Sequence, residues 1–461
     1  MSQIDNSARY KQLRASFPQF VYESFLTEKT ADGLRLVFEF SVNTELVFRP
    51  SMFFPDRGRF RELPEGLLDS LAFHIGMVEM ISYWKAFCSP LILIRPFRLN
   101  ARQEHWWKKL FRYGLGEFFF TNGIEMPGEE LLAFDYPPEA LPFKKYIPDL
   151  PGDGIIIPVG GGKDSVVTLE LLKALGHDHL PLVMNHRGAT RQVLETGGFS
   201  LQNSLEVKRT LDPLLFELNA RGFLNGHTPF SALLAFMTTL AAALTGRKYI
   251  ALSNEASANE ASIPGTKINH QYSKSFEFEQ DFRDYLQHHV LEGINYFSLL
   301  RPLNELQIAA LFARIPAYHG VFKSCNAGSK TDSWCCNCSK CLFTFIMIDP
   351  FLAENQLVKI FGENLFEKQS LAPLLDQLSG VADNKPFECV GTLNEVIAAL
   401  NYSIRKRGGE NLPALLKHFR HYHPEKPGLK TLEPFLQDFH SPHALEEPFV
   451  KLLKDALSEI T

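Results

Sequence analysis

The sequence lacks the features of a membrane or exported protein. No apolar run reaches the roughly 18 to 20 residues that a membrane-spanning helix needs. The polar N-terminal residues Met1–Asn6 do not show the basic-then-apolar order of a signal peptide. We therefore expect a cytoplasmic protein.

An excess of basic residues is also absent. Lys and Arg number 47 and Asp and Glu number 52, which gives a formal net charge of -5. This balance provides no general positive field for a nucleic acid, so a nucleic-acid partner is disfavoured. With 461 residues, 45% hydrophobic and 21% charged, the chain is long and apolar enough for two or three domains with a substantial core.

Cysteines are few and unevenly distributed. Of the seven, five lie between residues 325 and 341, while Cys88 and Cys389 stand alone. Such clustering is more typical of a metal or redox site than of a disulfide framework, and it agrees with a reducing compartment.

The N-terminal region has the pattern of a mixed α and β domain. Residues 17–22 and 34–40 predict a hairpin around Asp32-Gly33, residues 67–87 predict a helix, and residues 91–94 predict a strand. Residues 136–152 are rich in Pro and Gly, which is typical of a linker. We place a domain boundary near residue 148.

Beyond the linker, short apolar runs alternate with helical ones, which predicts an α/β fold with a parallel sheet and flanking helices. The runs are 155–159, 165–175, 180–184, 205–211, 229–244 and 249–252. After about residue 350 the pattern is helical and interrupted by prolines. We therefore predict three regions: a mixed α+β substrate-binding domain over 1–148, an ATP domain with the cysteine cluster over 149–348, and a helical region over 349–461.

A glycine-rich loop follows the first apolar run of the second region. Its residues are Gly160, Gly161, Gly162, Lys163, Asp164 and Ser165. Three glycines allow the backbone to approach an anion, and the helix beginning near Ser165 directs free N–H groups at the same place. Asp164 and Ser165 are also ordinary helix-capping residues, so a strand-turn-helix without a ligand is the alternative. The loop lacks both the Gly-Lys-Ser/Thr ending of the Walker loop and the spacing of a dinucleotide fold.

The order of residues in this loop resembles the SGGxDS motif of the N-type ATP pyrophosphatases, with Gly160 in place of the usual first Ser. The resemblance implies the PP-loop fold of the adenine nucleotide alpha hydrolase type. It implies that the loop holds the pyrophosphate of ATP, that Asp164 supports Mg²⁺, and that AMP is transferred to a substrate oxygen.

The cysteine cluster has the spacing Cys325-x9-Cys335-x2-Cys338-x2-Cys341, with Cys336 left over. Four thiolates are the number that completes a tetrahedral structural zinc site. The segment resembles the zinc-binding part of the deazaguanine synthase branch of the same superfamily. Small buried hydrophobic side chains and a thiol nucleophile for sulfur transfer are the other interpretations.

Polar residues follow a further apolar strand, at the position where open α/β sheets bind ligands. Asn254 and Glu255 come directly after residues 249–252, and His270, Tyr272 and Lys274 lie in a second polar segment. We expect one site made from both segments, with Asn254 near the nucleotide. His270, Lys274, Tyr272 and Glu255 are the candidate proton carriers, and solvated surface loops are the alternative.

Arg301 lies in Leu300–Leu306, a segment that resembles the "PL" segment of the N-type pyrophosphatases. Arg301 is expected to meet the nucleotide or a substrate anion, or else to form a structural ion pair with Glu305.

Taken together, these segments and residues 386–392 resemble the MurL family of UDP-N-acetylmuramoyl-L-alanyl-L-glutamate epimerases, over roughly residues 155–395. The resemblance implies that ATP adenylates the α-carboxylate of the terminal L-Glu of UDP-MurNAc-L-Ala-L-Glu. The mixed anhydride then loses its Cα proton and regains one on the other face. Hydrolysis releases the D-Glu epimer and AMP, so the implied cofactors are ATP and Mg²⁺, with a structural Zn²⁺, in peptidoglycan precursor synthesis.

Six arginines of the N-terminal region are candidates for binding the anionic groups of such a substrate. They are Arg57, Arg59, Arg61, Arg95, Arg98 and Arg102. Two other functions remain open from the sequence: a nucleobase or tRNA modification enzyme of the same superfamily, catalysing amidation or thiolation, and a nucleotide-binding module without catalysis.

Overall fold

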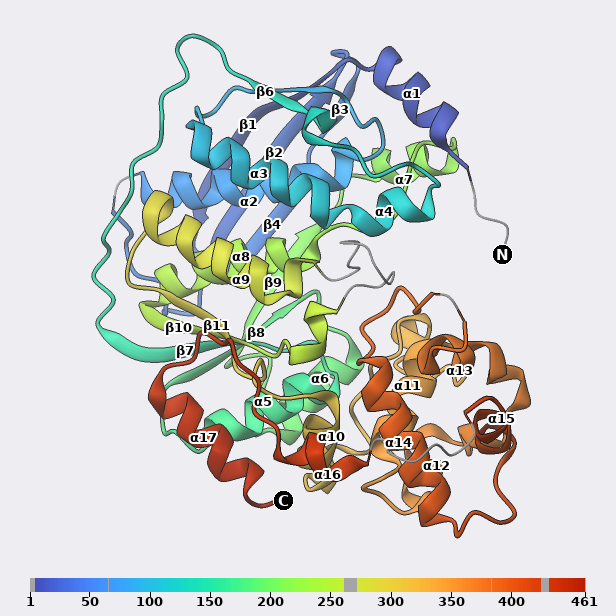
Figure 1. The fold of residues 1–461 in the computed structure, drawn as a ribbon. Helices are drawn as coiled ribbons and strands as arrows, with labels where there is room; N and C mark the ends of the chain where they lie inside the picture. Colours follow the sequence, from blue (N-terminus) through green and yellow to red (C-terminus); the bar gives the residue numbers. More distant parts are fainter. Residues whose placement is uncertain (1–4, 65, 261–271, 383, 424–430, 461) are drawn as a thin grey trace. The chain divides into compact units, whose positions relative to one another are not determined.

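The computed structural model describes residues 5–64, 66–260, 272–382, 384–423 and 431–460. They form a mixed α/β protein with a large β-sheet and many helices (Figure 1). Contacts divide the chain into two compact units. Unit 1 comprises Met1–Ile156, Leu205–Ile250 and Gln271–Tyr296, and unit 2 comprises Ile157–Ser204, Ala251–His270 and Phe297–Thr461. Within the described ranges, no helix is both long and apolar enough to cross a membrane.

The sheet of unit 1 has the strand order β9-β4-β2-β1-β5-β6, with β3 paired to β2. Its long antiparallel pair β1–β2 turns between Thr30 and Gly33, which confirms the predicted hairpin. In β2, Leu36, Phe38 and Phe40 are buried on one face, as the period of two along a strand requires. The strands are β1 (Gln19–Thr30), β2 (Gly33–Val42), β3 (Leu46–Phe48), β4 (Ser51–Pro55), β5 (Leu91–Ile94), β6 (Ala133–Asp135) and β9 (Leu205–Thr210).

Two apolar helices form much of the core of unit 1. Helix α2 (Leu67–Trp84) is buried on nearly all sides and contacts α8 (Phe230–Thr245), which is also buried. A helix that is apolar all round must lie inside the protein. The other helices of unit 1 are α1 (Ser7–Ser16), α3 (Ala101–Gly114), α4 (Gly116–Thr121), α7 (Pro213–Ala220) and α9 (Phe276–Tyr285), which continues into a π-helical turn (Leu286–Val290).

Three strands of the parallel part of the sheet begin in unit 1 and end in unit 2. They are β7 (Gly152–Pro158), β10 (Arg247–Leu252) and β11 (Asn295–Ser298), and β10 pairs with β7 in parallel. Strand β8 (His179–Met184) belongs to unit 2. Strands are therefore present at the predicted runs 155–159, 180–184 and 249–252, and the first and last of these pair in parallel. The run at 205–211 differs, because β9 pairs antiparallel with β4 of unit 1.

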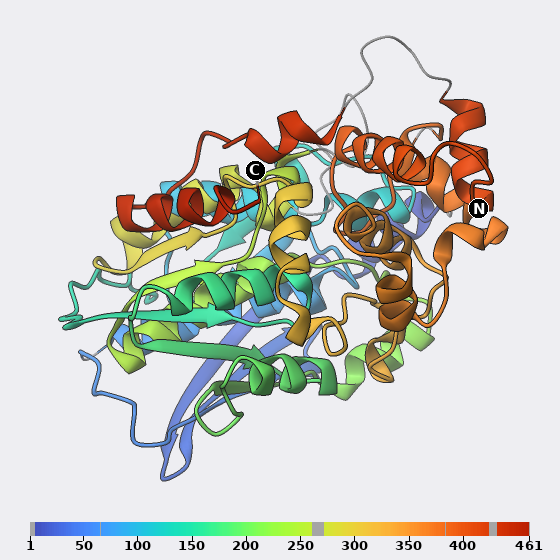
Figure 2. The ribbon, with the colours of Figure 1, turned by 90° about the horizontal axis from the view of Figure 1, so that it is seen from below.

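The remaining elements of unit 2 are helical. Helices α11, α13, α14 and α15 contact one another and lie together in both views (Figure 1 and Figure 2). The helices are α5 (Lys163–Lys173), α6 (Gly188–Thr196), α10 (Glu305–Ala313), α11 (Ser339–Ile348), α12 (Glu354–Phe361), α13 (Ala372–Ser379), α14 (Leu393–Lys406), α15 (Ala414–Tyr422), α16 (Leu432–Gln437) and α17 (Glu447–Leu457).

The predicted linker over residues 136–152 contains no helix before β7 begins at Gly152. The three predicted regions, with boundaries near residues 148 and 348, stay a prediction about domains. By contacts, unit 1 also takes in residues 205–250 and 271–296.

Candidate functional site

The glycine-rich loop connects strand β7 to helix α5. Gly162 is the N-cap of α5 and contributes no side-chain hydrogen bond, and the Ser165 hydroxyl donates to the Gly162 carbonyl oxygen at 2.9 Å. The first-turn N–H groups of α5 are therefore not capped by the side chain at this position. Such a helix start, after three glycines, has the form of an anion-binding site.

The three glycines of the loop differ in what they require. Gly161 has φ +89°, and a Cβ there would lie 3.1 Å from the Thr190 backbone nitrogen. A Cβ on Gly162 would lie 3.0 Å from the Ser324 hydroxyl oxygen. Around Gly160 no atom lies within 4 Å of an added Cβ, and Gly160 is not among the glycines with positive φ. Glycine is thus needed at 161 by conformation and contact, whereas 160 has room for a side chain.

Lys163 and Asp164 take part in a buried ion-pair group at the start of α5. The Lys163 ammonium contacts both the Asp164 and the Glu305 carboxylates, and the Lys163 and Glu305 side chains are 3% and 1% exposed. Burial opposes the charge on Lys163, but the two carboxylates outweigh it and raise its pKa. Burial raises the pKa of Glu305, and the attraction of Lys163 opposes this shift and favours the charged carboxylate. The buried ammonium of Lys163 therefore holds the Asp164 carboxylate in place.

The same group continues into helix α14. The Glu305 backbone N–H donates to the Glu395 carboxylate at 2.6 Å. Glu395 also accepts hydrogen bonds from the backbone and hydroxyl of Thr392, with which it forms a capping box. Burial raises the pKa of Glu395. One continuous set of contacts thus connects the glycine-rich loop, α10 and α14.

Polar groups meet where β10 and β11 end. The Asn254 side chain donates to the Ser298 hydroxyl at 3.0 Å, and Arg301 donates to the same hydroxyl at 3.3 Å and to the Glu255 carbonyl oxygen at 2.8 Å. Arg301 and Glu255 are buried. The structure therefore brings together the candidates Asn254, Glu255 and Arg301 from two neighbouring strand ends.

The other candidate proton carriers come from the second polar segment. Of these, His270 is outside the described residues. Tyr272 and Lys274 form a 3-10 turn that belongs to unit 1, whereas Glu255 belongs to unit 2. Burial, the leading cause, raises the pKa of Tyr272, whose hydroxyl lies 3.5 Å from an Asp281 carboxylate oxygen. At neutral pH the phenol therefore keeps its proton.

Unit 2 contains a cavity of about 330 Å³ beside these strand ends. Arg301 and Glu395 lie behind its surface, at 1% and 2% exposure. The cavity is lined by Ala256, Ser257, Asn259, Glu260, Arg301, Asn304, Thr392, Glu395, Phe435, His440, Ser441 and Pro442. The lining combines hydroxyl, amide, carboxylate and imidazole groups with apolar side chains such as Phe435 and Pro442.

The four cysteines predicted to bind a metal lie together in unit 2. The Sγ atoms of Cys325, Cys335, Cys338 and Cys341 are all within 4.8 Å of one another. The Sγ–Sγ distance is 3.5 Å for Cys338–Cys341, 3.7 Å for Cys335–Cys341 and 3.9 Å for Cys325–Cys338. Sulfur ligands 2.3 Å from a tetrahedral zinc are about 3.8 Å apart, so the four residues fit this metal.

The thiols of the cluster influence one another. Hydrogen bonding with the Cys341 side chain lowers the pKa of the Cys338 thiol, and the same contact raises the pKa of Cys341, while burial raises that of Cys335. Cys338 is the N-cap of α11. Cys336 is separate from the four, because its thiol donates to the Phe361 carbonyl oxygen at 3.1 Å.

Three of the six candidate arginines of the N-terminal region have local partners among the described residues. Arg95 forms an ion pair with Glu23 at 2.7 Å, and Arg61 donates to the Asp149 carbonyl oxygen at 2.7 Å. Arg98 lies over the Tyr136 ring, 5.4 Å from its centroid. These contacts stabilise the fold, and a role in substrate binding stays a prediction for all of Arg57, Arg59, Arg61, Arg95, Arg98 and Arg102.

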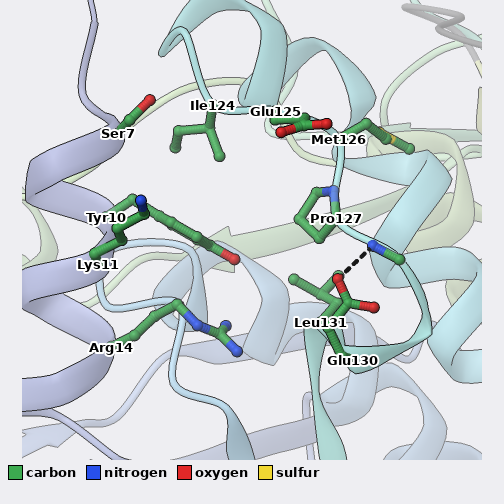
Figure 3. A pocket seen from close by; sticks show the side chains of 11 residues that line it. Ser7, Tyr10, Lys11, Arg14, Ile124, Glu125, Met126, Pro127, Glu130 and Leu131 are labelled. Carbon is green, nitrogen blue, oxygen red and sulfur yellow. Dashed lines mark hydrogen bonds between the residues drawn. The ribbon is translucent and has the colours of Figure 1, made fainter.

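Unit 1 has its own cavity, of about 570 Å³, between helix α1 and residues 124–131. Figure 3 shows Tyr10 and Arg14 extending from α1 toward Pro127 and Glu130. Arg14 donates to the Cys88 carbonyl oxygen at 2.6 Å, and Glu130 accepts from the Gly128 backbone. The lining carries two cations and two carboxylates, so it does not select for an anion.

The sequence did not single out Glu395, Thr190 or Asp332 as parts of the site, and it placed Glu305 only as a partner of Arg301. Thr190 donates to the Gly160 carbonyl oxygen at 3.3 Å, and Asp332 accepts from the first residues of α6. One weak signal was available for Asp332: α6 begins after Arg187, which cannot cap a helix start, so a partner from elsewhere was needed.

The fold and the site define a mixed α/β protein with a glycine-rich loop at a helix N-terminus and a four-cysteine cluster. Two family models match it in order along the chain: the MurL N-terminal domain over residues 11–299 and the MurL C-terminal domain over residues 321–430. The chain therefore belongs to the MurL family.

Curated relatives agree with this assignment. A protein of Xanthomonas oryzae pv. oryzae is 37% identical over 70% of this chain and 72% of its own length. A protein of Salinispora tropica is 36% identical over 74% of each, and one of a Micromonospora species is 36% identical over 70% and 72%. Each of these relatives is named UDP-N-acetyl-alpha-D-muramoyl-L-alanyl-L-glutamate epimerase.

Proposed function

We propose that this protein converts the terminal L-Glu of UDP-MurNAc-L-Ala-L-Glu into D-Glu, in an ATP-dependent reaction of peptidoglycan precursor synthesis. The observation that carries the proposal is the match of both MurL domain models, together with three relatives that are all named as this epimerase. These matches span most of the chain, including both the phosphate loop and the cysteine cluster.

Two features of the loop support a role for ATP. Helix α5 starts without a side-chain cap at Gly162, and the loop before it is held open by glycine at 161. In this proposal the loop backbone and the N-terminus of α5 bind the pyrophosphate part of ATP. Asp164, oriented by Lys163, supports a Mg²⁺ ion, which would neutralise phosphate charge when bound.

The chemistry explains why an epimerase needs ATP. The Cα–H of a free carboxylate resists ionisation, because removing its proton adds a second negative charge to the anion. In the proposed reaction the α-carboxylate oxygen attacks the α-phosphorus, the bond to pyrophosphate breaks, and an acyl-adenylate forms. Its Cα proton moves to a protein base, a proton returns on the opposite face, and water releases AMP and the D-Glu product.

The proposed proton carriers remain His270, Lys274, Tyr272 and Glu255. Their environments differ: burial raises the pKa of Tyr272, so this phenol keeps its proton at neutral pH and is not the base that removes the Cα proton. Glu255 lies next to Arg301 at the strand ends of unit 2, in the same unit as Asp164. Arg301 and Asn254 are the proposed contacts for the nucleotide or the activated carboxylate.

The four cysteines are proposed to bind one structural zinc. Four thiolates complete a tetrahedral site and leave no position open for a substrate. When bound, the metal would supply folding energy to this segment and take no part in proton transfer.

The experiment is to incubate the purified protein with ATP, Mg²⁺ and UDP-MurNAc-L-Ala-L-Glu, and to follow AMP, pyrophosphate and the chirality of Glu. We expect AMP and pyrophosphate in equal amounts, D-Glu product, and one solvent deuterium at Cα when the reaction is run in D₂O. Omitting ATP should abolish deuterium incorporation. Asp164→Asn keeps the shape of the side chain and should greatly reduce pyrophosphate release.

Each other outcome has a clear meaning. The absence of substrate-dependent AMP would refute the proposal. AMP formation without a change of chirality would indicate another acceptor, as in nucleobase or tRNA modification. ATP binding with no cleavage would identify a nucleotide-binding module.

A further inference from the structure

The chain immediately before the cysteine cluster runs along the phosphate loop. The Lys323 backbone N–H donates to the Gly161 carbonyl oxygen at 2.9 Å. One residue further, Ser324 approaches Gly162 so closely that a Cβ there would lie 3.0 Å from its hydroxyl oxygen. Cys325, the first residue of the cluster, follows directly. One side of the loop is therefore formed by the start of the cysteine segment.

Asp332 fastens the same segment to helix α6. Its two carboxylate oxygens accept hydrogen bonds from the Gly188 and Ala189 backbone N–H groups, at 3.1 and 2.9 Å. These are the first two residues of α6, which has no side-chain cap from its own N-cap residue, Arg187. A carboxylate at this position also complements the helix dipole. Asp332 has φ +49°, a strained conformation for a non-glycine residue, which its two hydrogen bonds help to hold.

The first turn of α6 forms the other side of the phosphate loop. The Thr190 hydroxyl donates to the Gly160 carbonyl oxygen at 3.3 Å, and the Thr190 backbone nitrogen would lie 3.1 Å from a Cβ on Gly161. The loop therefore lies between Thr190 and the Lys323–Ser324 backbone. Both of these neighbours are connected to the cysteine segment, one through Asp332 and one through the chain itself.

The cluster fixes both ends of the stretch that carries Asp332. Cys325 precedes Asp332 and Cys335 follows it, and both sulfurs belong to the four-cysteine group. Holding these two residues on one metal would restrict the intervening residues, which otherwise contain only a short 3-10 turn at Ala327–Lys330.

We propose that residues 323–335 are a brace for the phosphate loop, with Asp332 as its positioning residue and the metal on the four cysteines as its anchor. Metal occupancy then sets the affinity of the loop for ATP, although the metal touches no nucleotide. The proposal rests on the proposed function in one respect, namely that the loop binds ATP. Its structural part, the coupling of the segment to the loop, stands apart from ATP.

The test compares two capping aspartates. Asp332→Ala removes the brace, and Asp212→Ala is the matched control, because Asp212 also accepts two backbone N–H groups, from Arg49 at 2.7 Å and Leu214 at 2.9 Å, but at α7 of unit 1. Asp332→Asn guards against misfolding, since it keeps one acceptor and the shape of the side chain. The readouts are zinc content, hydrogen exchange of residues 159–165, and calorimetric binding of a non-hydrolysable ATP analogue.

We expect Asp332→Ala to retain zinc, to increase exchange in residues 159–165, and to raise the analogue Kd about tenfold. Asp332→Asn should have a smaller effect in the same direction. Asp212→Ala should change neither the exchange of residues 159–165 nor the analogue Kd. Removal of zinc from the wild-type protein by a chelator should reproduce the effect of Asp332→Ala.

Unchanged exchange in residues 159–165 after both Asp332→Ala and zinc removal would overturn the brace. Faster exchange with an unchanged analogue Kd would overturn its control of ATP affinity. If the wild-type protein binds no analogue at all, the proposed function fails, while the exchange measurement still decides whether the brace exists.

Discussion

Replacing Gly160 by Ser tests whether the loop binds phosphate. The change introduces the hydroxyl that the SGGxDS motif of the N-type ATP pyrophosphatases has at this position. The structure leaves room for it: no atom lies within 4 Å of an added Cβ, and Gly160 is exposed. A hydrogen bond to a charged group contributes about 1.5 to 3 kcal/mol. The lower figure corresponds to a Kd about tenfold tighter.

Gly161→Ser is the matched control one residue away. Gly161 has φ +89°, and its Cβ would lie 3.1 to 3.2 Å from the Thr190 backbone. The left-handed conformation alone costs about 1 to 2 kcal/mol in an L-residue. We expect this variant to bind ATP at least tenfold more weakly. Its urea unfolding midpoint should fall only by about the amount that this conformational cost predicts.

The assay is calorimetric binding of a non-hydrolysable ATP analogue with Mg²⁺, followed by the KM for ATP in AMP formation. Opposite responses of the two variants would support a phosphate site at this loop. Equal analogue affinity in the wild type, Gly160→Ser and Gly161→Ser would refute the reasoning, because a loop that binds phosphate cannot be indifferent to both changes.

Two further predictions concern stability. Lys163→Met should lower the free energy of unfolding by about 3 to 5 kcal/mol, because it leaves the buried Glu305 carboxylate without its cation, and adding Glu305→Gln should recover part of the loss. Arg191→Met, which breaks an exposed pair with Glu195, should hardly change the midpoint of the same urea titration, because solvent screens this pair, and equal losses would contradict the buried ion pair. His74 is fully buried and accepts or donates hydrogen bonds with Ser70 and Tyr285, and burial lowers its pKa to about 3. Between pH 6.5, the ordinary pKa of His in the unfolded chain, and about pH 3, this imidazole binds a proton in the unfolded chain but not in the folded protein. Its contribution to the free energy of unfolding is therefore fully present above pH 6.5 and falls by about 1.4 kcal/mol per pH unit below it. His74→Gln should remove this one-proton slope between pH 4 and 6 in urea titrations, and an unchanged slope would be evidence against the neutral buried imidazole.

The features that could be predicted from the sequence are those that depend on residues close together in the chain. The β1–β2 hairpin, helix α2 and the β7–loop–α5 unit are set by periodicity and by glycines at fixed positions, and the structure contains them at nearly the predicted residues. The four cysteines could be grouped because thiolates at short spacing have few other uses. In each case the signal lies within about twenty residues.

The contacts that complete the loop could not be predicted in this way. Lys163 finds Glu305 142 positions away, and Ala189 finds Asp332 143 positions away. Any of the chain's carboxylates could pair with a given lysine or cap a given helix, so residue type and local spacing do not select these partners. The antiparallel pairing of β9 with β4 was missed for the same reason, since local alternation does not reveal the direction of a distant partner.

These long-range contacts bear on how the two matched domains act together. The phosphate loop lies within the residues matched by the N-terminal family model, whereas Asp332, Glu395 and the cysteines lie within those matched by the C-terminal one. The loop's Lys163 contacts Glu305, whose backbone binds Glu395, and the first turn of α6 binds Asp332. An N-terminal fragment ending near residue 299 would keep every glycine of the loop and Asp164, but it would lose Glu305, the buried partner of Lys163, and Asp332, the cap of α6. The surroundings of the glycine-rich loop are therefore supplied by residues of both matched domains and by Glu305 between them.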